Sequence, residues 1–311
     1  MTLQVKTALD AATSVPSNGD RPQSKVGSSY ISARFPPSPR VRWEPLQPAK
    51  TVDDVVRNLD QIIEWAIRED STIGYFAVLY KRSTVAVRDA LNEGEFKDRQ
   101  LMEHFDVVFA QRYFDALNAY FHPDEYDGLT LPWEVVFVGQ ELGHSTMLQH
   151  MVAGLNAHIQ FDLGVVTAQI VPTTLQVFQQ DFNLINELVA GQVRGMLTIV
   201  DRLSPTIRWI RWLIPVRGRL IAWVLRKFRK SCWFFAIYLA VHPDKVREKT
   251  VNQMAWTAAL CAWYLHPPEY WRLTPAIIRA IAKRESRDTA ANLRVLNESM
   301  ISLDKLGKAD L

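Results

Sequence analysis

The sequence predicts an all-α protein: a single-domain helical bundle preceded by a disordered N-terminal tail. Two observations carry this prediction. Apolar residues recur at three- and four-residue spacing through most of the chain, and the apolar–polar alternation typical of half-buried strands is scarce. With 48% hydrophobic residues among 311, the chain can bury one large core. We therefore divide it into a tail, 1–49, and a helical domain, 50–311.

The tail and the first helices follow from composition and capping signals. Residues 1–49 are rich in Ser, Pro and Arg and cannot form a packed core, so we expect a tail that drapes over the domain. Thr51 is placed as the N-cap of an amphipathic helix whose apolar face begins at Val52. Further helices are expected over 73–94, which ends at Gly94, and over about 98–121.

The middle of the chain predicts a helical hairpin. One long helix is expected over about 133–170, beginning after Pro132 and ending before Pro172. A partner helix, capped by Thr173 or Thr174, reaches about residue 200 and would pack antiparallel to the first. Helices near 244–265 and 274–303 complete the domain.

The segment GLNAHIQFDL contains the most informative pair of residues. His158 and Asp162 are four positions apart and therefore project from the same face of a helix. With this spacing a carboxylate can hold one imidazole nitrogen while the other faces a substrate, or both side chains can bind one metal ion. The same pair also occurs as an ordinary core hydrogen bond.

The predicted hairpin would place this pair opposite Asn183 and Glu187 on the partner helix. Buried polar groups are costly unless they are paired, so such a cluster needs either a structural or a catalytic reason. We expect His158 as general acid or base and Asp162 as its orienting group. The expected substrate-binding residues are Asn156, Asp181, Asn186 and Glu187.

Metal sites are the main alternative for the same residues. A metal-dependent hydrolase would use His158, Asp162, Asp181 and Glu187 as ligands. A di-iron bundle needs two Glu-x-x-His pairs, and the chain offers one, Glu141 and His144. His144 also lies about 21 Å from His158 by helical rise, too far to share an ion. No metal is expected on the favoured interpretation.

A basic, tryptophan-rich stretch over 206–233 has two interpretations. It can rest on an anionic membrane as an interfacial helix, or it can be a solvated basic face whose tryptophans pack inward. The net charge of +3 is too small to indicate nucleic acid.

Targeting and cofactor signals narrow the function classes. The N-terminus lacks the apolar run of a signal peptide, no stretch is long enough to span a bilayer, and two cysteines suit a reducing compartment. We therefore expect a cytoplasmic protein. No dinucleotide fingerprint, nucleophile elbow or haem-attachment motif is present, which predicts an enzyme without a cofactor.

Four segments, ALNAYFH, FDVVFAQRYFDAL, GLNAHIQFDL and DFNLINE, resemble blocks of a bacterial and fungal family, domain of unknown function 5995. The resemblance runs from about Thr51 to residue 300 and is sharpest over 154–163 and 181–187. It implies a helical fold and a preferred site around His158 and Asp162. The Pro/Ser-rich tail departs from the compact bacterial pattern and is similar to a fungal extension.

These observations predict an enzyme of specialised metabolism that acts on an apolar small molecule. A non-redox cyclisation, isomerisation or elimination of a terpenoid or polyketide-like substrate would suit an aromatic-rich core with one buried acid–base pair. The alternatives are the metal-dependent hydrolase and a non-catalytic lipid- or membrane-binding helical protein.

Overall fold

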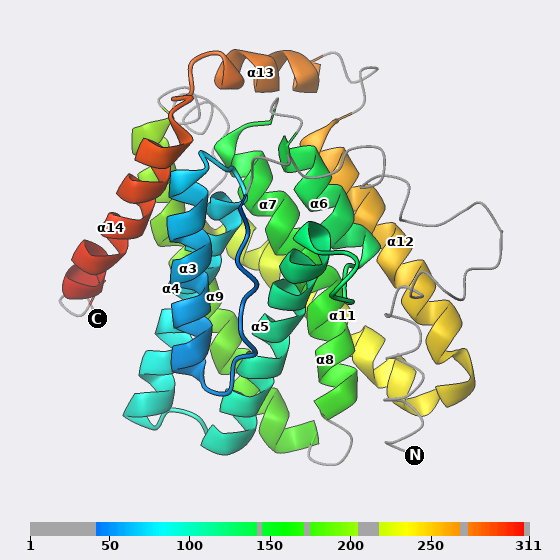
Figure 1. The fold of residues 1–311 in the computed structure, drawn as a ribbon. Helices are drawn as coiled ribbons and strands as arrows, with labels where there is room; N and C mark the ends of the chain where they lie inside the picture. Colours follow the sequence, from blue (N-terminus) through cyan, green and yellow to red (C-terminus); the bar gives the residue numbers. More distant parts are fainter. Residues whose placement is uncertain (1–41, 142–144, 171–174, 205–217, 268–272, 308–311) are drawn as a thin grey trace, which may run out of the picture.

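The computed structural model describes residues 42–141, 145–170, 175–204, 218–267 and 273–307, and these ranges contain helices and no strand. The predicted all-α class is therefore confirmed. The helices pack as a bundle in which α4 contacts α3, α7, α9 and α14 (Figure 1). In chain order the elements are α3 (Val52–Arg68), α4 (Gly74–Glu93), α5 (Arg99–Phe121), α6 (Leu131–Glu141), α7 (Met147–Ala157), the π-helix η1 (His158–Asp162), α8 (Leu163–Ile170), α9 (Leu175–Leu203), α11 (Gly218–Val241), the short 3₁₀ helix η2 (Pro243–Lys245), α12 (Val246–Leu265), α13 (Leu273–Ala282) and α14 (Thr289–Gly307).

Helix α3 begins where the sequence predicts. The hydroxyl of Thr51 accepts a hydrogen bond from the backbone N–H of Asp54, and the Asp54 carboxylate accepts one from the backbone N–H of Thr51. This capping box satisfies two backbone donors that a helix start otherwise leaves unpaired. The apolar face from Val52 to Ala66 is buried and packs mainly against α4, α5 and α14.

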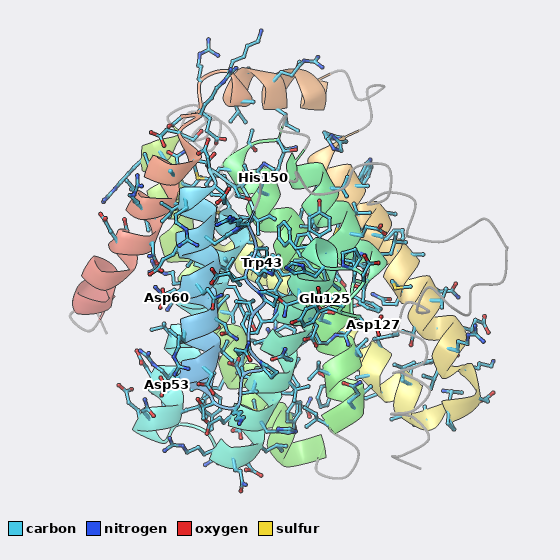
Figure 2. All side chains as sticks on the ribbon, viewed as in Figure 1. Trp43, Asp53, Asp60, Glu125, Asp127 and His150 are labelled. Atoms are coloured by element: carbon cyan, nitrogen blue, oxygen red, sulfur yellow. The ribbon has the colours of Figure 1, made fainter. Side chains whose placement is uncertain are left out.

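The end of the predicted tail packs on the domain. Residues 1–41 lie outside the described residues, whereas 42–50 run as an extended segment whose Trp43 and Leu46 are buried (Figure 2). Asn118 on α5 holds this segment. Its Oδ1 accepts hydrogen bonds from Trp43 Nε1 and Leu46 N at 3.1 and 2.9 Å, and its Nδ2 donates to the Leu46 carbonyl at 3.0 Å. The packed domain therefore includes eight residues of the predicted tail.

The single long helix predicted over 133–170 is wrong. Helix α6 ends at Glu141, and α7 starts after Thr146, whose hydroxyl accepts from Gln149 N while the Gln149 side chain accepts from Thr146 N. This second capping box starts a new helix and thereby allows α6 and α7 to lie side by side. Helix α12 packs against both of them.

The predicted hairpin between this region and α9 is also wrong. Helix α9 packs against α4, α11 and α14, and α8 packs against α11 and α5. The reason is the apolar stripe of α9. Phe178, Phe182 and Ile185 are buried, whereas Asn183 and Glu187 lie on the opposite face and are exposed.

Within the part of the basic stretch that the structure describes, some side chains pack against the core and others are exposed. Residues 205–217 lie outside the described residues. Arg229 is buried, with its guanidinium carbon 4.7 Å from the centre of the Phe182 ring, and Trp233 stacks on Phe178 at 6.1 Å. Lys227 is exposed. Across the residues described, no helix combines the length and apolar character that a bilayer span requires.

Candidate functional site

The candidate site is built on an unusual helical turn. Residues His158 to Asp162 form a π-helix between α7 and α8, in which the backbone N–H of Leu163 donates to the carbonyl of His158. All five residues are buried. Single π-turns inside α-helices are uncommon and occur frequently at functional sites.

The carboxylate of Asp162 is the centre of the hydrogen-bond network. Its Oδ2 contacts His158 Nδ1 at 3.2 Å and accepts from Trp133 Nε1 at 2.7 Å, while its Oδ1 accepts from Arg112 Nε at 2.8 Å. Burial alone would raise the pKa of Asp162, but the Arg112 charge and the hydrogen bonds from His158 and Trp133 hold that pKa below its usual value. Asp162 is therefore an ionised acceptor at neutral pH.

This ionised carboxylate fixes the tautomer of His158. An ionised carboxylate can only accept, so Nδ1 of His158 must carry the proton of their shared hydrogen bond. Burial lowers the pKa of His158, and Asp162 opposes that shift without reversing it. The imidazole is consequently neutral at pH 7, with a lone pair on Nε2.

Aromatic side chains enclose the imidazole. Its ring is stacked on Phe109 with 3.7 Å between centroids and 11° between planes. Tyr80 meets it edge-on at 4.6 Å, and Phe76 and Trp133 lie at 5.8 and 5.9 Å. Among the residues that the structure describes, none forms a hydrogen bond with the buried Nε2. A buried basic nitrogen with no partner is costly and therefore needs a ligand or a functional reason.

A small cavity borders this aromatic enclosure. Tyr80 and Phe109 line it together with Asp106 on α5 and Arg229 on α11, and its volume is about 30 Å³, enough for one or two water molecules. Asp106 Oδ2 and Arg229 Nε and Nη2 are buried without a hydrogen-bond partner in the described ranges. Burial and the nearby Glu103 raise the pKa of Asp106 to about 7, and burial lowers the pKa of Arg229 to about 10.

Of the predicted site residues, the structure brings together His158 and Asp162. Asn156 faces α12, where its Nδ2 donates to the Thr257 carbonyl and to Cys261 Sγ, both at 3.2 Å. Asp181 accepts from the backbone N–H groups of Lys97 and Asp98 at 2.9 and 3.0 Å, close to the start of α5. Residue 98 and Phe109 are eleven positions apart on that helix, so Asp181 lies roughly 16 Å along α5 from the imidazole.

The remaining two predicted residues lie near the surface of α9. Asn186 is half-buried and its Nδ2 donates to Asn183 Oδ1 at 3.5 Å, and Glu187 is exposed. The expected contact of His158 and Asp162 with the 181–187 segment is therefore wrong, although the pair is shielded from water as predicted.

The ligands expected for the metal-dependent hydrolase do not lie together in the structure. Asp181 and Glu187 do not reach the His158–Asp162 pair, and within the described ranges no group of three or more His, Cys, Asp or Glu side chains could hold a metal ion. His144 and the side chain of Glu141 lie outside the described residues.

Sequence reasoning missed four contributors: Arg112, Trp133, Asp106 and Arg229. The first three carried a detectable signal. Asp106 and Arg112 lie among the apolar residues of the α5 stripe, and Trp133 follows Pro132 in the first turn of α6. Charged residues within a buried stripe need partners, and Asp162 is the partner of Arg112.

A comparison with known families covers this whole cluster. The model of a family of unknown function, DUF5995, matches residues 52–268, which is more than half of the chain. The chain belongs to the DUF5995 family. The match contains every residue of the His158 network and of the adjacent cavity, and it ends before α13. No curated protein and no solved structure matches the chain. The DUF5995 assignment therefore confirms the resemblance seen in the sequence without adding an activity.

Proposed function

We propose that this DUF5995 protein is an enzyme in which His158 is the general acid–base residue for a non-redox reaction of an apolar small molecule. The observation that carries the proposal is the unequal environment of the two imidazole nitrogens. Nδ1 is held by Asp162, which Arg112 and Trp133 anchor, while Nε2 is buried and has no partner in the described part of the chain. A base that must accept a proton needs such a free nitrogen and a fixed orientation.

The proton balance of this reaction is simple. Nε2 takes a proton from a carbon or hydroxyl of the substrate, and the resulting imidazolium is stabilised by the Asp162 carboxylate at 3.2 Å. The same proton returns from Nε2 to another substrate atom in an isomerisation or cyclisation, or to the leaving group in an elimination. Asp106, whose pKa is raised to about 7, is a second group able to exchange a proton near neutral pH.

The aromatic enclosure favours an apolar substrate. Phe76, Tyr80, Phe109 and Trp133 surround His158, which suits the terpenoid or polyketide-like molecules of specialised biosynthesis. The cavity of about 30 Å³ is smaller than such molecules. Substrate binding therefore requires side chains that line the cavity to move apart.

We assign this activity to the cytoplasm. Cys232 and Cys261 are free and buried, and burial raises the pKa of each thiol to about 12, so neither is an activated nucleophile. Free thiols suit a reducing compartment. The metal-dependent hydrolase is less favoured because Asp181 bonds to Lys97 and Asp98 instead of joining the pair.

The test measures substrate conversion in D₂O, where a proton on Nε2 that exchanges with solvent before it returns to carbon leaves a deuterium label. Purified protein is incubated in D₂O with a panel of terpenoid and polyketide substrates, and products are analysed by mass spectrometry. We expect conversion by the wild type, with or without deuterium in the product, and a loss of turnover of roughly 100-fold or more in His158→Gln. His104→Gln, which alters an exposed histidine on α5, is the matched control. A folded His158→Gln protein with wild-type turnover would refute the proposal.

A further inference from the structure

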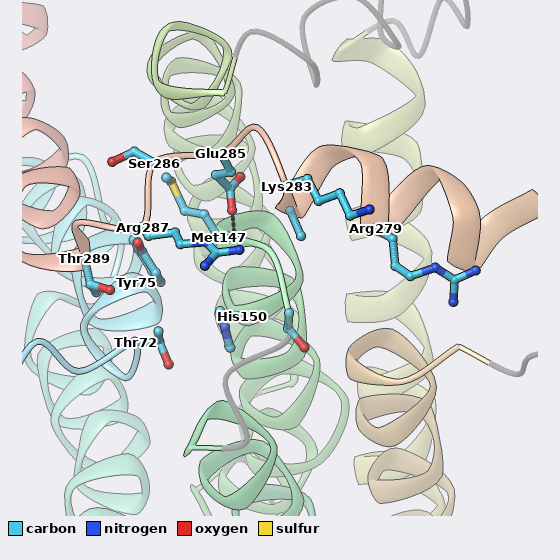
Figure 3. A pocket seen from close by; sticks show the side chains of 12 residues that line it. Thr72, Tyr75, Met147, His150, Arg279, Lys283, Glu285, Ser286, Arg287 and Thr289 are labelled. Atoms are coloured by element: carbon cyan, nitrogen blue, oxygen red, sulfur yellow. Dashed lines mark hydrogen bonds between the residues drawn. The ribbon is translucent and has the colours of Figure 1, made fainter.

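A second, larger pocket lies at the end of the bundle where α7 begins. Its volume is about 730 Å³, within the range of small-molecule sites (Figure 3). The pocket is lined by Tyr75 on α4 and His150 on α7, and by four residues of the α13–α14 region, Arg279, Lys283, Arg287 and Thr289, among others. His150 precedes His158 by eight positions, about 12 Å of helical rise, so this pocket is separate from the site described above.

The mouth of the pocket carries an excess of positive charge. Arg279, Lys283 and Arg287 are exposed, and in the described part of the chain none of them forms an ion pair. These three cations outnumber the one carboxyl group of the lining, that of Glu285. Such a lining attracts anions.

The start of α7 also lines this pocket. Glu285 Oε2 accepts a hydrogen bond from the backbone N–H of Met147, the first residue of α7, at 2.8 Å (Figure 3). A carboxylate of the chain itself thus already occupies the positive end of the helix. Burial raises the pKa of Glu285, and the hydrogen bond from Met147 only opposes that shift, so the preference of the pocket for anions comes from the three exposed cations.

The floor of the pocket contains a polar atom without a partner. His150 is 1% exposed, and its ring is stacked on Tyr75 with 6.0 Å between centroids. Its Nδ1 has no hydrogen-bond partner in the described residues. Nearby, the Tyr75 hydroxyl accepts from Asn292 Nδ2 at 3.2 Å, so the floor also offers a fixed hydroxyl. In Figure 3, His150 lies farther from α13 than Arg287 does, on the side of the helical bundle.

We propose that this pocket binds a small anionic molecule whose phosphate or carboxylate group is held by Arg279, Lys283 and Arg287. A hydroxyl or amine of the same molecule forms a hydrogen bond with Nδ1 of His150. The exposed cations at the mouth and the buried imidazole at the floor together select a ligand with an anionic end and a polar, uncharged end. This inference does not depend on the activity proposed for His158.

The first experiment is calorimetric titration at constant ionic strength with inorganic phosphate and, separately, with acetate. We expect saturable binding of at least one, weakened about tenfold by the double variant Lys283→Gln/Arg287→Gln, because charge-assisted hydrogen bonds are lost. Arg284→Gln is the matched control: Arg284 is exposed in the same segment but does not line the pocket. Binding of phosphate alone or of acetate alone identifies the anionic group. No saturable binding, or equal weakening by Arg284→Gln, overturns the proposal.

The second experiment follows the imidazoles directly. In protein labelled with ¹⁵N-histidine, a ligand that carries a hydroxyl next to its anionic group, glycerol 3-phosphate or lactate, should shift the ring nitrogens of His150 and leave those of His158 unchanged. The circular dichroism spectrum of each variant checks that it folds. If the ligand binds saturably without any change at His150, it contacts only the exposed cations, and the proposed hydrogen bond with Nδ1 of His150 is wrong.

Discussion

The imidazole of His158 and the ring of Phe109 lie face to face, 3.7 Å apart and within 11° of parallel. Phe109 comes from α5, the same helix that supplies Arg112 to Asp162. One helix therefore fixes both the plane of the imidazole and the carboxylate that orients it. Rotation of His158 about its side-chain bonds would break the stack and the hydrogen bond together, so the position of Nε2 is strongly constrained.

The first prediction concerns Asp162→Asn. Asp162 raises the pKa of His158 against the effect of burial, so replacing its charge with an amide should lower the pKa of His158 further. A ¹⁵N-detected pH titration of the histidine ring measures this. Asp53→Asn, an exposed change on α3, should leave the pKa of His158 unchanged. A rise in the pKa of His158 in the Asn variant would contradict the assigned network.

The sequence allowed the His158–Asp162 contact to be predicted because four-residue spacing on a helix is a local property. The other partners of Asp162 could not be found in this way. Arg112 and Trp133 are 50 and 29 positions away, and they reach Asp162 because α5 and α6 pack against the region of η1 and α7. The local sequence pattern does not indicate which helices pack against one another.

The wrong partner helix has an equally specific cause. Pairing by chain order placed α9 opposite His158, whereas the apolar stripe of α9 packs Phe178 and Phe182 against Phe105 and turns Asn183 and Glu187 outward. Burial of aromatic surface outweighs the proximity of two consecutive helices in the chain. The start of α7 could have been predicted from the sequence, because Thr146 and Gln149 have the spacing of a capping box.

The second prediction compares two glycines in helices. A Cβ at Gly154 would lie 2.5 Å from Cγ of Phe76, a ring that encloses His158, whereas a Cβ at Gly191 on α9 would meet nothing within 4 Å. Gly154→Ala should therefore lower the free energy of unfolding by about 1–3 kcal/mol, because the ring must move. Gly191→Ala should raise it by about 0.5–1 kcal/mol through lower chain entropy. Urea denaturation measures both, and a stabilised Gly154→Ala protein would refute the close packing at Phe76.

The third prediction concerns Asp106, whose folded-state pKa is raised from 3.8 to about 7. Between these values the folded state binds more protons than the unfolded state, so the stabilising contribution increases as the pH falls. Asp106→Asn has the shape of the neutral acid and lacks this titration. From pH 8 to 5.5 the wild type should gain about 2 kcal/mol relative to the variant. Parallel stability curves for the two proteins would show that Asp106 is not buried as an acid.

The last prediction concerns His150, whose pKa burial lowers from 6.5 to about 4. The change in stability with pH has the opposite sign to that expected for Asp106. Between pH 6.5 and 4 the unfolded state binds the proton that the folded state rejects, so stability is present above pH 6.5 and is lost as the pH falls. His150→Gln retains hydrogen-bonding capacity but does not titrate in this range. The wild type should therefore lose about 2 kcal/mol of stability relative to His150→Gln between pH 7 and 5.

The comparison of the two proteins isolates His150. Titrations of Asp106 and other groups are common to both proteins and cancel in the difference. Chemical denaturation at each pH measures this difference, and a ligand whose hydroxyl forms a hydrogen bond with Nδ1 of His150 should change its size. A difference that does not vary with pH would mean that His150 is open to solvent and accepts a proton freely, which is incompatible with a buried imidazole at the floor of the pocket.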